Sequence, residues 1–205
     1  MTKALETLER LREGNARFRE CAERKDLDND ARAALANGQS PSAVIIGCAD
    51  SRVSPELAFD QGLGQLFVIR IAGHVIAAAA LESVELAVEQ LGAKLVVVLG
   101  HTGCAAVGAT LAEVQTPGTP AAEKLSAVIH HIKPPVEAVC SLHPDAEQDE
   151  LMHECVRANV RHAAEQLRSD SAAISALVES GEVLVVGAEY CLQSGAVDFF
   201  DGVSA

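Results

Sequence analysis

Four short apolar runs, distributed along the whole chain, constrain the fold of this protein more than any other feature. They are rich in valine, isoleucine and leucine and occupy residues 43–48, 66–70, 95–100 and 183–187. Continuous apolar runs of this length are typical of strands that are buried on both faces, as in a parallel sheet. The sequence therefore predicts four buried strands.

Segments with helical periodicity separate these runs. Apolar residues recur every three or four positions in the segments 77–91, 104–115, 150–168 and 171–179. Strands that alternate with helices predict an α/β fold, with a mostly parallel central sheet of four strands flanked by helices. After the fourth run, Ser194-Gly195 precedes the apolar segment 197–200, which predicts a hairpin and an antiparallel edge strand.

Two parts of the chain fit this pattern less well. The segments 4–25 and 29–36 predict helices with little apolar surface of their own, so we expect these N-terminal helices to extend onto a partner subunit. The segment 116–149 contains five prolines and predicts one helix over 121–132 together with a surface excursion.

Length and composition fit one domain of 205 residues, in which residues 1–40 form the N-terminal helices and residues 41–205 the α/β core. Hydrophobic residues make up 49% and charged residues 22%, as in globular proteins with a full core. The net charge of −13 argues against nucleic-acid binding, which depends on lysine and arginine. The low aromatic content of 3% argues against aromatic surfaces on which bases could stack.

The chain shows no apolar signal segment at its start and no stretch that is long and apolar enough to span a membrane. We therefore expect a cytoplasmic protein without membrane association. Thiols stay reduced in that compartment, so the six cysteines are interpreted as buried thiols, metal ligands or nucleophiles.

Polar residues with metal-binding or acid–base chemistry follow two of the predicted strands. Cys48, Asp50 and Arg52 come directly after the first run, and His101 and Cys104 come directly after the third. Ligands of open α/β sheets bind outside the carboxyl ends of strands, where the strand order reverses. If the first and third strands are neighbours, these residues converge on one crevice.

Two thiolates and one imidazole are a ligand set that suits zinc. Catalytic zinc sites use three protein ligands and keep a position for water, whose pKa falls to about 7 on the metal. Simpler interpretations exist for each residue alone. Cys48 could be an inert core thiol, His101 and Cys104 a chance pair, and Asp50 and Arg52 a helix cap with a surface ion pair. Their order and their positions after strands favour a site.

Asp50 and Arg52 are close enough in sequence to form an ion pair that keeps the carboxylate ionised. The carboxylate could then orient a zinc-bound hydroxide toward substrate. If the ion pair breaks, Asp50 could instead bind zinc and displace the water. The sequence thus predicts two alternative states for one residue.

At these positions the chain resembles the β-class carbonic anhydrases. The Cys-x-Asp-x-Arg segment at Cys48 is followed 53 residues later by His-x-x-Cys at His101. Residues 59–64, 68–70 and 72–74 look like the family's intervening segment, and residues 187–190 and 195–200 like its closing strands. The clear likeness covers 43–108 and a weaker one 183–201. Ile71 and Ala105 depart from the family's usual asparagine and glycine.

The resemblance implies the reversible hydration of carbon dioxide to bicarbonate with one Zn²⁺ per chain. It implies Cys48, His101 and Cys104 as zinc ligands, Asp50 and Arg52 as the catalytic pair, and Asp50 as a further zinc ligand in a closed state at lower pH. It also implies a homodimer or larger homo-oligomer.

Two other functions stay open on the same residues. Relatives within the family hydrolyse carbonyl sulfide or carbon disulfide, and these would use the same metal and the same acidic residue. A non-catalytic module that binds zinc or bicarbonate is the third interpretation, although a structural zinc would need neither Asp50 nor Arg52. Outside the motifs, Arg70 is interpreted as structural, His74 as structural or as a proton shuttle, and Tyr190 as a core residue.

Overall fold

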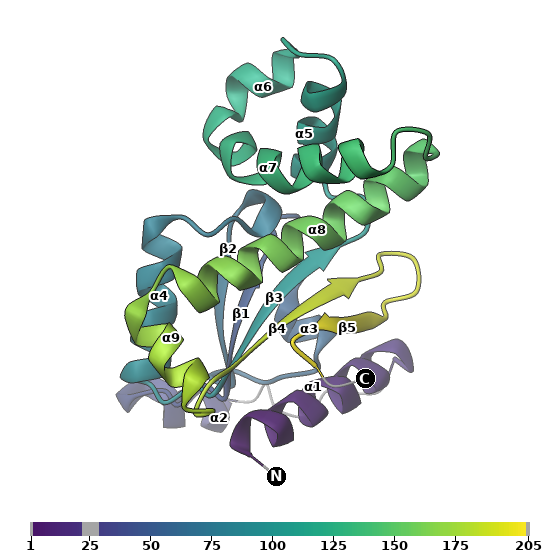
Figure 1. Cartoon of the computed structure of the whole chain (residues 1–205). Coiled ribbons are helices and arrows are strands. Elements are labelled where there is room, and N and C mark those ends of the chain that lie inside the picture. The colour runs from purple at the N-terminus through teal and green to yellow at the C-terminus, as the bar shows by residue number, and fades with distance from the viewer. Residues whose placement is uncertain (1, 22–28, 204–205) are drawn as a thin grey trace.

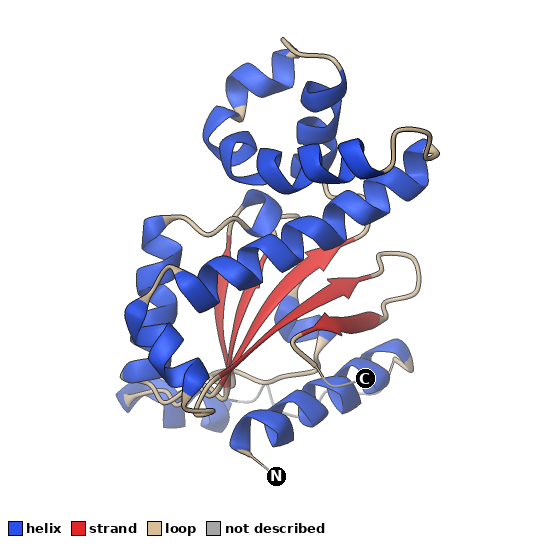
Figure 2. Cartoon of the chain, viewed as in Figure 1, coloured by secondary structure: helices blue, strands red, loops and turns tan. Residues whose placement is uncertain are grey.

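A five-stranded sheet forms the centre of the protein (Figures 1 and 2). In the computed structural model, residues 2–21 and 29–203 are described. The strands are β1 (Ala43–Gly47), β2 (Leu66–Arg70), β3 (Leu95–His101), β4 (Leu184–Tyr190) and β5 (Val197–Asp201). They lie in the order β2-β1-β3-β4-β5; β1 to β4 are parallel, and β5 is antiparallel to β4. The predicted parallel sheet with an antiparallel edge strand is confirmed.

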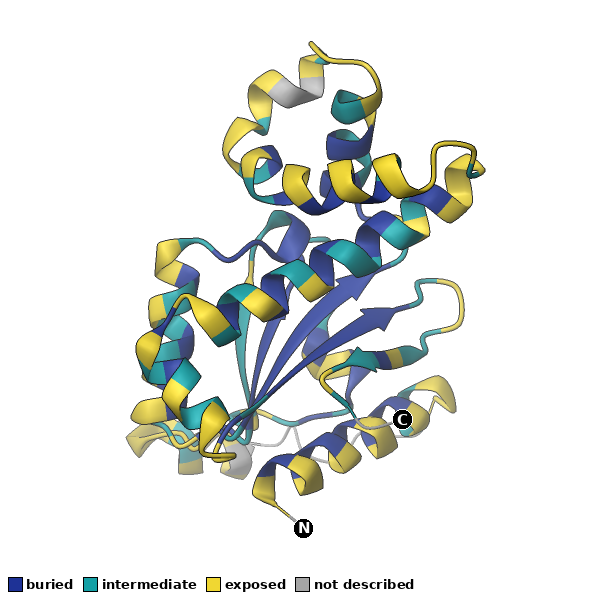
Figure 3. Ribbon diagram, viewed as in Figure 1, coloured by how far each residue is buried: buried dark blue, intermediate teal, exposed yellow. Residues whose placement is uncertain are grey.

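The sheet is covered on both faces, which explains the continuous apolar runs. Successive side chains of a strand point to opposite faces. In β1, Val44 and Ile46 join the core on one face, and Ala43 and Ile45 join the core on the other. Figure 3 shows the central strands as buried along their length.

Three helices cover the first face: α4 (Ala78–Glu89), α8 (Gln148–Ser169) and α9 (Ala172–Glu179). Val84 and Val88 of α4 and Val160 and Leu167 of α8 are buried in the core of this face. The Ser171 hydroxyl accepts a hydrogen bond from the Ile174 amide and so caps α9 at its start. These helices match the periodic segments of the sequence.

The second face is covered by α1 (Lys3–Arg19) and the short helix α3 (Pro55–Ala58). Leu8 and Leu11 of α1 are buried in the core of this face. Although α1 carries little apolar surface, its apolar stripe packs on the sheet of its own chain. The C-terminal part of the helix expected over 4–25 lies outside the described residues. Extension of this region onto a partner stays a prediction.

The remaining N-terminal elements are α2 (Asn29–Ala34) and the 3-10 helix η1 (Leu35–Asn37). They match the short helix expected over 29–36. None of the helices within residues 2–21 and 29–203 is long and apolar enough to cross a membrane.

Beyond the carboxyl ends of the parallel strands lie α5 (Ala105–Gln115), α6 (Pro120–Lys124) and α7 (Ser126–Leu142) (Figure 1). The expectation of a single helix over 121–132 is wrong, because α7 continues through Pro134 and Pro135. Proline deprives the helix of an amide donor and normally interrupts it. Here the buried residues Ile132, Val136 and Val139 keep the helical spacing and pack in the core beside α5 and α8, which offsets the lost hydrogen bonds.

Candidate metal centre

The centre lies where the order of the parallel strands reverses. β1 lies between β2 and β3 in the sheet. The next strand along the chain, β2, is on one side of β1, and the following strand, β3, is on the other side, so the strand order reverses at β1. Cys48 directly follows β1, His101 is the last residue of β3, and Cys104 directly precedes α5. The adjacency of the first and third strands, on which the predicted convergence depended, is confirmed.

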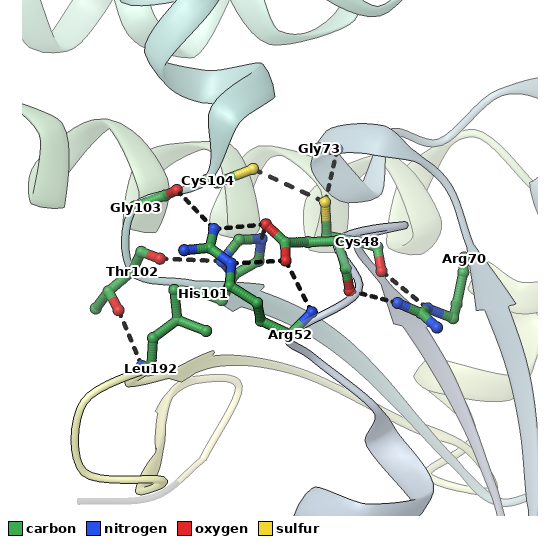
Figure 4. Close-up of polar contacts among 10 residues, drawn as sticks. Cys48, Arg52, Arg70, Gly73, His101, Thr102, Gly103, Cys104 and Leu192 are labelled. Carbon is green, nitrogen blue, oxygen red and sulfur yellow. Dashed lines mark hydrogen bonds and ion pairs between the residues drawn. The ribbon is translucent and has the colours of Figure 1, made fainter.

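The three predicted ligands come together in the structure. One ligand atom from each of Cys48, His101 and Cys104 lies within 4.8 Å of the other two, and all three residues are buried. The two sulfur atoms are 3.9 Å apart. Figure 4 shows these side chains converging from the ends of β1 and β3.

The two thiols influence each other's ionisation. The hydrogen bond with Cys104 lowers the pKa of the Cys48 thiol far below its usual value, and the Gly73 amide, 3.4 Å from the Cys48 sulfur, acts in the same direction. The hydrogen bond with Cys48 raises the pKa of Cys104, and burial raises it further. The pair thus ionises first at Cys48, and a divalent cation would favour the thiolate form of both.

The His101 ring presents one nitrogen to the cluster. Its Nδ1 atom lies 3.0 Å from the carbonyl oxygen of Thr102, which can only accept a hydrogen bond, so Nδ1 carries the proton. Its Nε2 atom is buried and has no hydrogen-bond partner in the part of the chain that is described. With Nδ1 directed at the Thr102 carbonyl, which fixes the ring orientation, the buried Nε2 is the nitrogen that faces the two thiols and could bind zinc.

Asp50 and Arg52 form the predicted pair at the edge of this cluster. Arg52 donates from Nε to Asp50 Oδ1 over 2.9 Å and from Nη2 to Oδ2 over 2.6 Å, and its backbone amide donates to Oδ1 over 3.0 Å. These bonds hold the pKa of the Asp50 carboxyl well below its usual range. Asp50 Oδ2 lies 3.9 Å from His101 Nε2, so the ionised carboxylate borders the cluster.

Comparisons with known proteins identify the family. Residues 43–197 match the carbonic anhydrase family. Carbonic anhydrase 2 of Mycobacterium tuberculosis is 42% identical over 188 residues, which cover 90% of this chain and 87% of that protein. The solved structure of the β-carbonic anhydrase CcaA superimposes with a TM-score of 0.77 at 27% identity and covers 97% of this chain and 93% of that one. The chain belongs to the β-carbonic anhydrase family.

The carbonic anhydrase of Mycolicibacterium smegmatis is 39% identical over 193 residues and covers 92% of this chain and 89% of that protein. Two tetrameric β-carbonic anhydrases from Sordaria macrospora share the fold, with a TM-score of 0.70 at 20% identity over 85% of this chain and 87% of that chain. The family resemblance expected from the motifs is confirmed, and with it the enzyme class of the carbonate dehydratases, which are lyases.

In this β-carbonic anhydrase, Arg70 holds the loop that carries Cys48 and Asp50. Its Nε atom donates to the Cys48 carbonyl over 3.0 Å, and its Nη2 atom donates to the Asp50 carbonyl. The residue interpreted as structural thus fixes the backbone at Cys48, a predicted ligand, and at Asp50, a member of the predicted catalytic pair. Figure 4 shows Arg70 on the side of Cys48 away from His101.

His74 lies in the 3-10 helix η2 (Ala72–His74) and is completely buried. Burial lowers the pKa of its ring to about 4, so the imidazole is neutral at neutral pH. A neutral ring without solvent contact cannot exchange protons with water, which favours the structural interpretation over the proton shuttle. Its partner is Asn159 of α8, a residue that no motif spacing identifies.

The end of β4 supports the His101 turn of this β-carbonic anhydrase. The Thr102 amide donates to the Tyr190 carbonyl over 3.0 Å, and the Leu192 amide donates to the Thr102 hydroxyl over 3.0 Å. The Tyr190 ring packs against Phe18 of α1 with centroids 6.4 Å apart, as expected for a core residue. The contacts at Thr102 are made by the backbone of β4 and its following loop, so the sequence carries little signal for them.

Proposed function

We propose that this β-carbonic anhydrase catalyses the reversible hydration of carbon dioxide to bicarbonate and a proton, with one zinc ion per chain. The observation that carries the proposal is the convergence of three donor atoms within 4.8 Å at the strand-order reversal, one of them the buried His101 Nε2, which has no hydrogen-bond partner among the described residues. Cys48 and Cys104 supply the other two. Catalytic zinc sites use three protein ligands and keep a position for water, and this Cys₂His set would supply those three ligands.

Zinc at this position would supply a Lewis acid that turns water into a nucleophile near neutral pH. The protein's own contribution is to hold the donors in place. The Thr102 carbonyl orients the His101 ring, and the Gly73 amide orients the Cys48 sulfur. Such contacts tune a metal site as well as position it.

Asp50 is proposed to orient the attacking water. Arg52 keeps the carboxylate ionised and fixes it with two side-chain hydrogen bonds. Ionised Oδ2 can accept a hydrogen bond from the water and so direct an oxygen lone pair at the carbon of carbon dioxide. The oxygen–carbon bond forms, bicarbonate is the product, and the remaining proton passes to solvent.

Asp50 is also proposed as a fourth zinc ligand in a closed state. The separation of 3.9 Å between Oδ2 and His101 Nε2 supports this, because a small rotation would bring the carboxylate to the cluster. The three hydrogen bonds from Arg52 favour the orienting state described above. The closed state would dominate when the ion pair is broken.

Metal analysis and hydration kinetics across pH test the proposal. We expect about one zinc per chain and a hydration rate that rises with pH and falls when a chelator removes the metal. Turnover of carbonyl sulfide and carbon disulfide is measured beside it, since the same residues could hydrolyse those substrates. Faster turnover of carbonyl sulfide than of carbon dioxide, or a protein without zinc, would contradict the proposal.

We also propose that the enzyme is a cytoplasmic homodimer or larger homo-oligomer. Reduced thiols at Cys48 and Cys104 suit a compartment that keeps cysteines reduced. Leu57, Leu63 and Leu86 are each nearly half exposed on the single chain, and covering them with a second copy would remove apolar surface from water. A second copy of the chain is the proposed partner.

A further inference from the structure

A strained turn lies directly behind the Cys48 sulfur. Gly73 and His74 both have positive φ angles, of 65° and 46°. Glycine adopts this conformation readily, whereas histidine does so only when its surroundings hold it there. A side chain at Gly73 would also meet Ile132, since an added Cβ would lie 2.5 Å from Ile132 Cδ1. The turn is therefore confined by its backbone geometry and by its neighbours.

Asn159 of α8 holds this turn. The residue is only 2% exposed, and its Nδ2 atom lies 2.9 Å from the Gly73 carbonyl oxygen and 2.9 Å from His74 Nε2. A carbonyl oxygen only accepts, so the amide NH₂ must face it and His74 Nε2 must be the second acceptor. One buried amide thus binds both residues that have positive φ angles.

The same turn contacts the metal centre. The Gly73 amide donates to the Cys48 sulfur over 3.4 Å. The His74 ring is packed beside β3, because a Cβ added at Gly100 would lie 3.4 Å from His74 Cε1 and 2.5 Å from Val160 of α8. A continuous set of contacts therefore runs from α8 through Gly73 and His74 to Cys48.

We propose that Asn159 is a positioning residue of the metal centre, which holds the turn at 73–74 so that the Gly73 amide donates to the Cys48 sulfur. This rests on the proposed function, in which Cys48 ligates zinc. An amide donor stabilises the negative charge of a thiolate and fixes its direction, and outer contacts of this kind typically change metal affinity by about 10–100-fold. Without Asn159, the strained turn relaxes and the donor moves away from the sulfur.

The test compares Asn159→Leu with the wild-type holoenzyme. Leucine keeps the branched shape and the number of side-chain heavy atoms, although its methyl groups are bulkier, and it cannot donate a hydrogen bond. We expect the dissociation constant for zinc, measured by chelator competition, to rise by about 10–100-fold. We also expect a shifted thiolate-to-metal charge-transfer band in the cobalt(II)-substituted protein, because the sulfur loses its amide donor.

Asn15→Ala is the matched control. Asn15 is also buried, and its Nδ2 atom donates to the carbonyls of Ala58 and Gly195 over 2.9 and 2.8 Å, but these contacts link α1 to α3 and to the β4–β5 loop, away from α8. We expect this variant to lose thermal stability while its zinc affinity stays at the wild-type value. Asn159→Ser is the second variant if the leucine variant does not fold, and it should show a smaller loss of zinc affinity.

Wild-type zinc affinity and an unchanged cobalt spectrum in a folded Asn159 variant would overturn the inference. An equal loss of zinc affinity in Asn15→Ala would also overturn it, because general destabilisation would then explain the effect. A wild-type protein that binds zinc but does not hydrate carbon dioxide would contradict the proposed function and leave the role of Asn159 in metal binding standing.

Discussion

The proposed metal ligands and the proposed catalytic pair lie within one site but in different surroundings. Cys48, His101 and Cys104 are at most 5% exposed. The side chain of Asp50 is 14% exposed and that of Arg52 is 55% exposed. Backbone groups of neighbouring loops orient the buried side chains, whereas the Asp50 carboxylate is held by the half-exposed guanidinium and the backbone amide of Arg52.

This difference separates two tasks. Buried donors with fixed directions are suited to holding a metal tightly. The Arg52 guanidinium is about half exposed, so water can take over its hydrogen bonds if the carboxylate leaves the pair. The buried side chains are thus held in one arrangement. The carboxylate of Asp50 can adopt two, either paired with Arg52 or turned toward the metal position. Substitutions of the buried side chains are therefore expected to reduce zinc binding, and substitutions of the pair to reduce activity alone.

The largest effect is expected for the buried ligands. Cys48→Ser, His101→Ala and Cys104→Ser should each lose zinc and lose hydration activity down to the rate of the metal-free protein, because two remaining donors bind zinc far more weakly than three. Metal analysis and stopped-flow hydration measure both. Full zinc occupancy in Cys104→Ser would remove the basis of the ligand assignment.

The next largest effect is expected for the exposed pair, and it should fall on activity alone. Arg52→Ala should retain zinc but lose hydration by about 100-fold or more, because Asp50 loses its orientation and becomes free to occupy the fourth position. Arg12→Ala is the control, since it breaks an exposed ion pair of α1 with Glu9. Near wild-type hydration in Arg52→Ala at neutral pH would make the pair an ordinary surface contact.

Asp50→Ala separates the two roles of the carboxylate. This variant should also hydrate carbon dioxide slowly, but its fourth metal position should stay open and bind azide. Arg52→Ala should bind azide weakly, because Asp50 competes for the same position. Titration with azide, followed in the cobalt(II)-substituted protein, measures the difference. Equal azide affinity in the two variants would refute a closed state with Asp50 on the metal.

Assembly decides how exposed the catalytic pair is in solution. If a second copy covers the half-exposed Leu57, Leu63 and Leu86, light scattering should give at least twice the mass of one chain at micromolar concentration. A dimer that covers part of the site edge would reduce the difference in exposure between ligands and pair. A well-folded monomer at that concentration would contradict the proposed assembly.

The position of the site could be predicted because buried strands appear in the sequence as continuous apolar runs. Strands such as β1 and β3 are apolar throughout since both faces are covered, and Cys48 and His101 stand out as the first polar chemistry at their ends. The hydrogen bonds that support Cys48 and His101 are harder to predict from the sequence. The Gly73 amide and the Thr102 carbonyl are backbone groups, which every residue has.

Asn159 does leave a signal, since it is a polar residue on the apolar side of α8 between Val156 and Val160. A buried polar group needs a partner, so its position indicates a hydrogen bond to another element, although not to which one. The course of α7 could not be predicted because Pro134 and Pro135 normally end a helix, and only the packing of its apolar side shows that this one continues.

The smallest effect is expected at a buried carboxylate outside the metal centre. Glu189 is 5% exposed and lies between His153 and Arg157, whose side-chain nitrogens are 3.4 and 3.5 Å away. Burial raises its pKa, the opposite of the shift at Asp50. The protonated form is therefore favoured in the folded state, so this group contributes stability below its ordinary pKa and loses that contribution as pH rises through the raised value.

Glu189→Gln should remove this dependence, because glutamine resembles the protonated acid and does not titrate. Arg157 keeps its ion pair with Asp198 at 2.9 Å and its position over the Phe200 ring, so the local packing should survive. We expect the difference in melting temperature between variant and wild type to shift in favour of the variant as pH rises from the acidic range toward neutrality. Thermal unfolding in a pH series measures this difference. A constant difference across the series would mean that Glu189 titrates alike in the folded and unfolded chain, and its burial would then have no effect on charge.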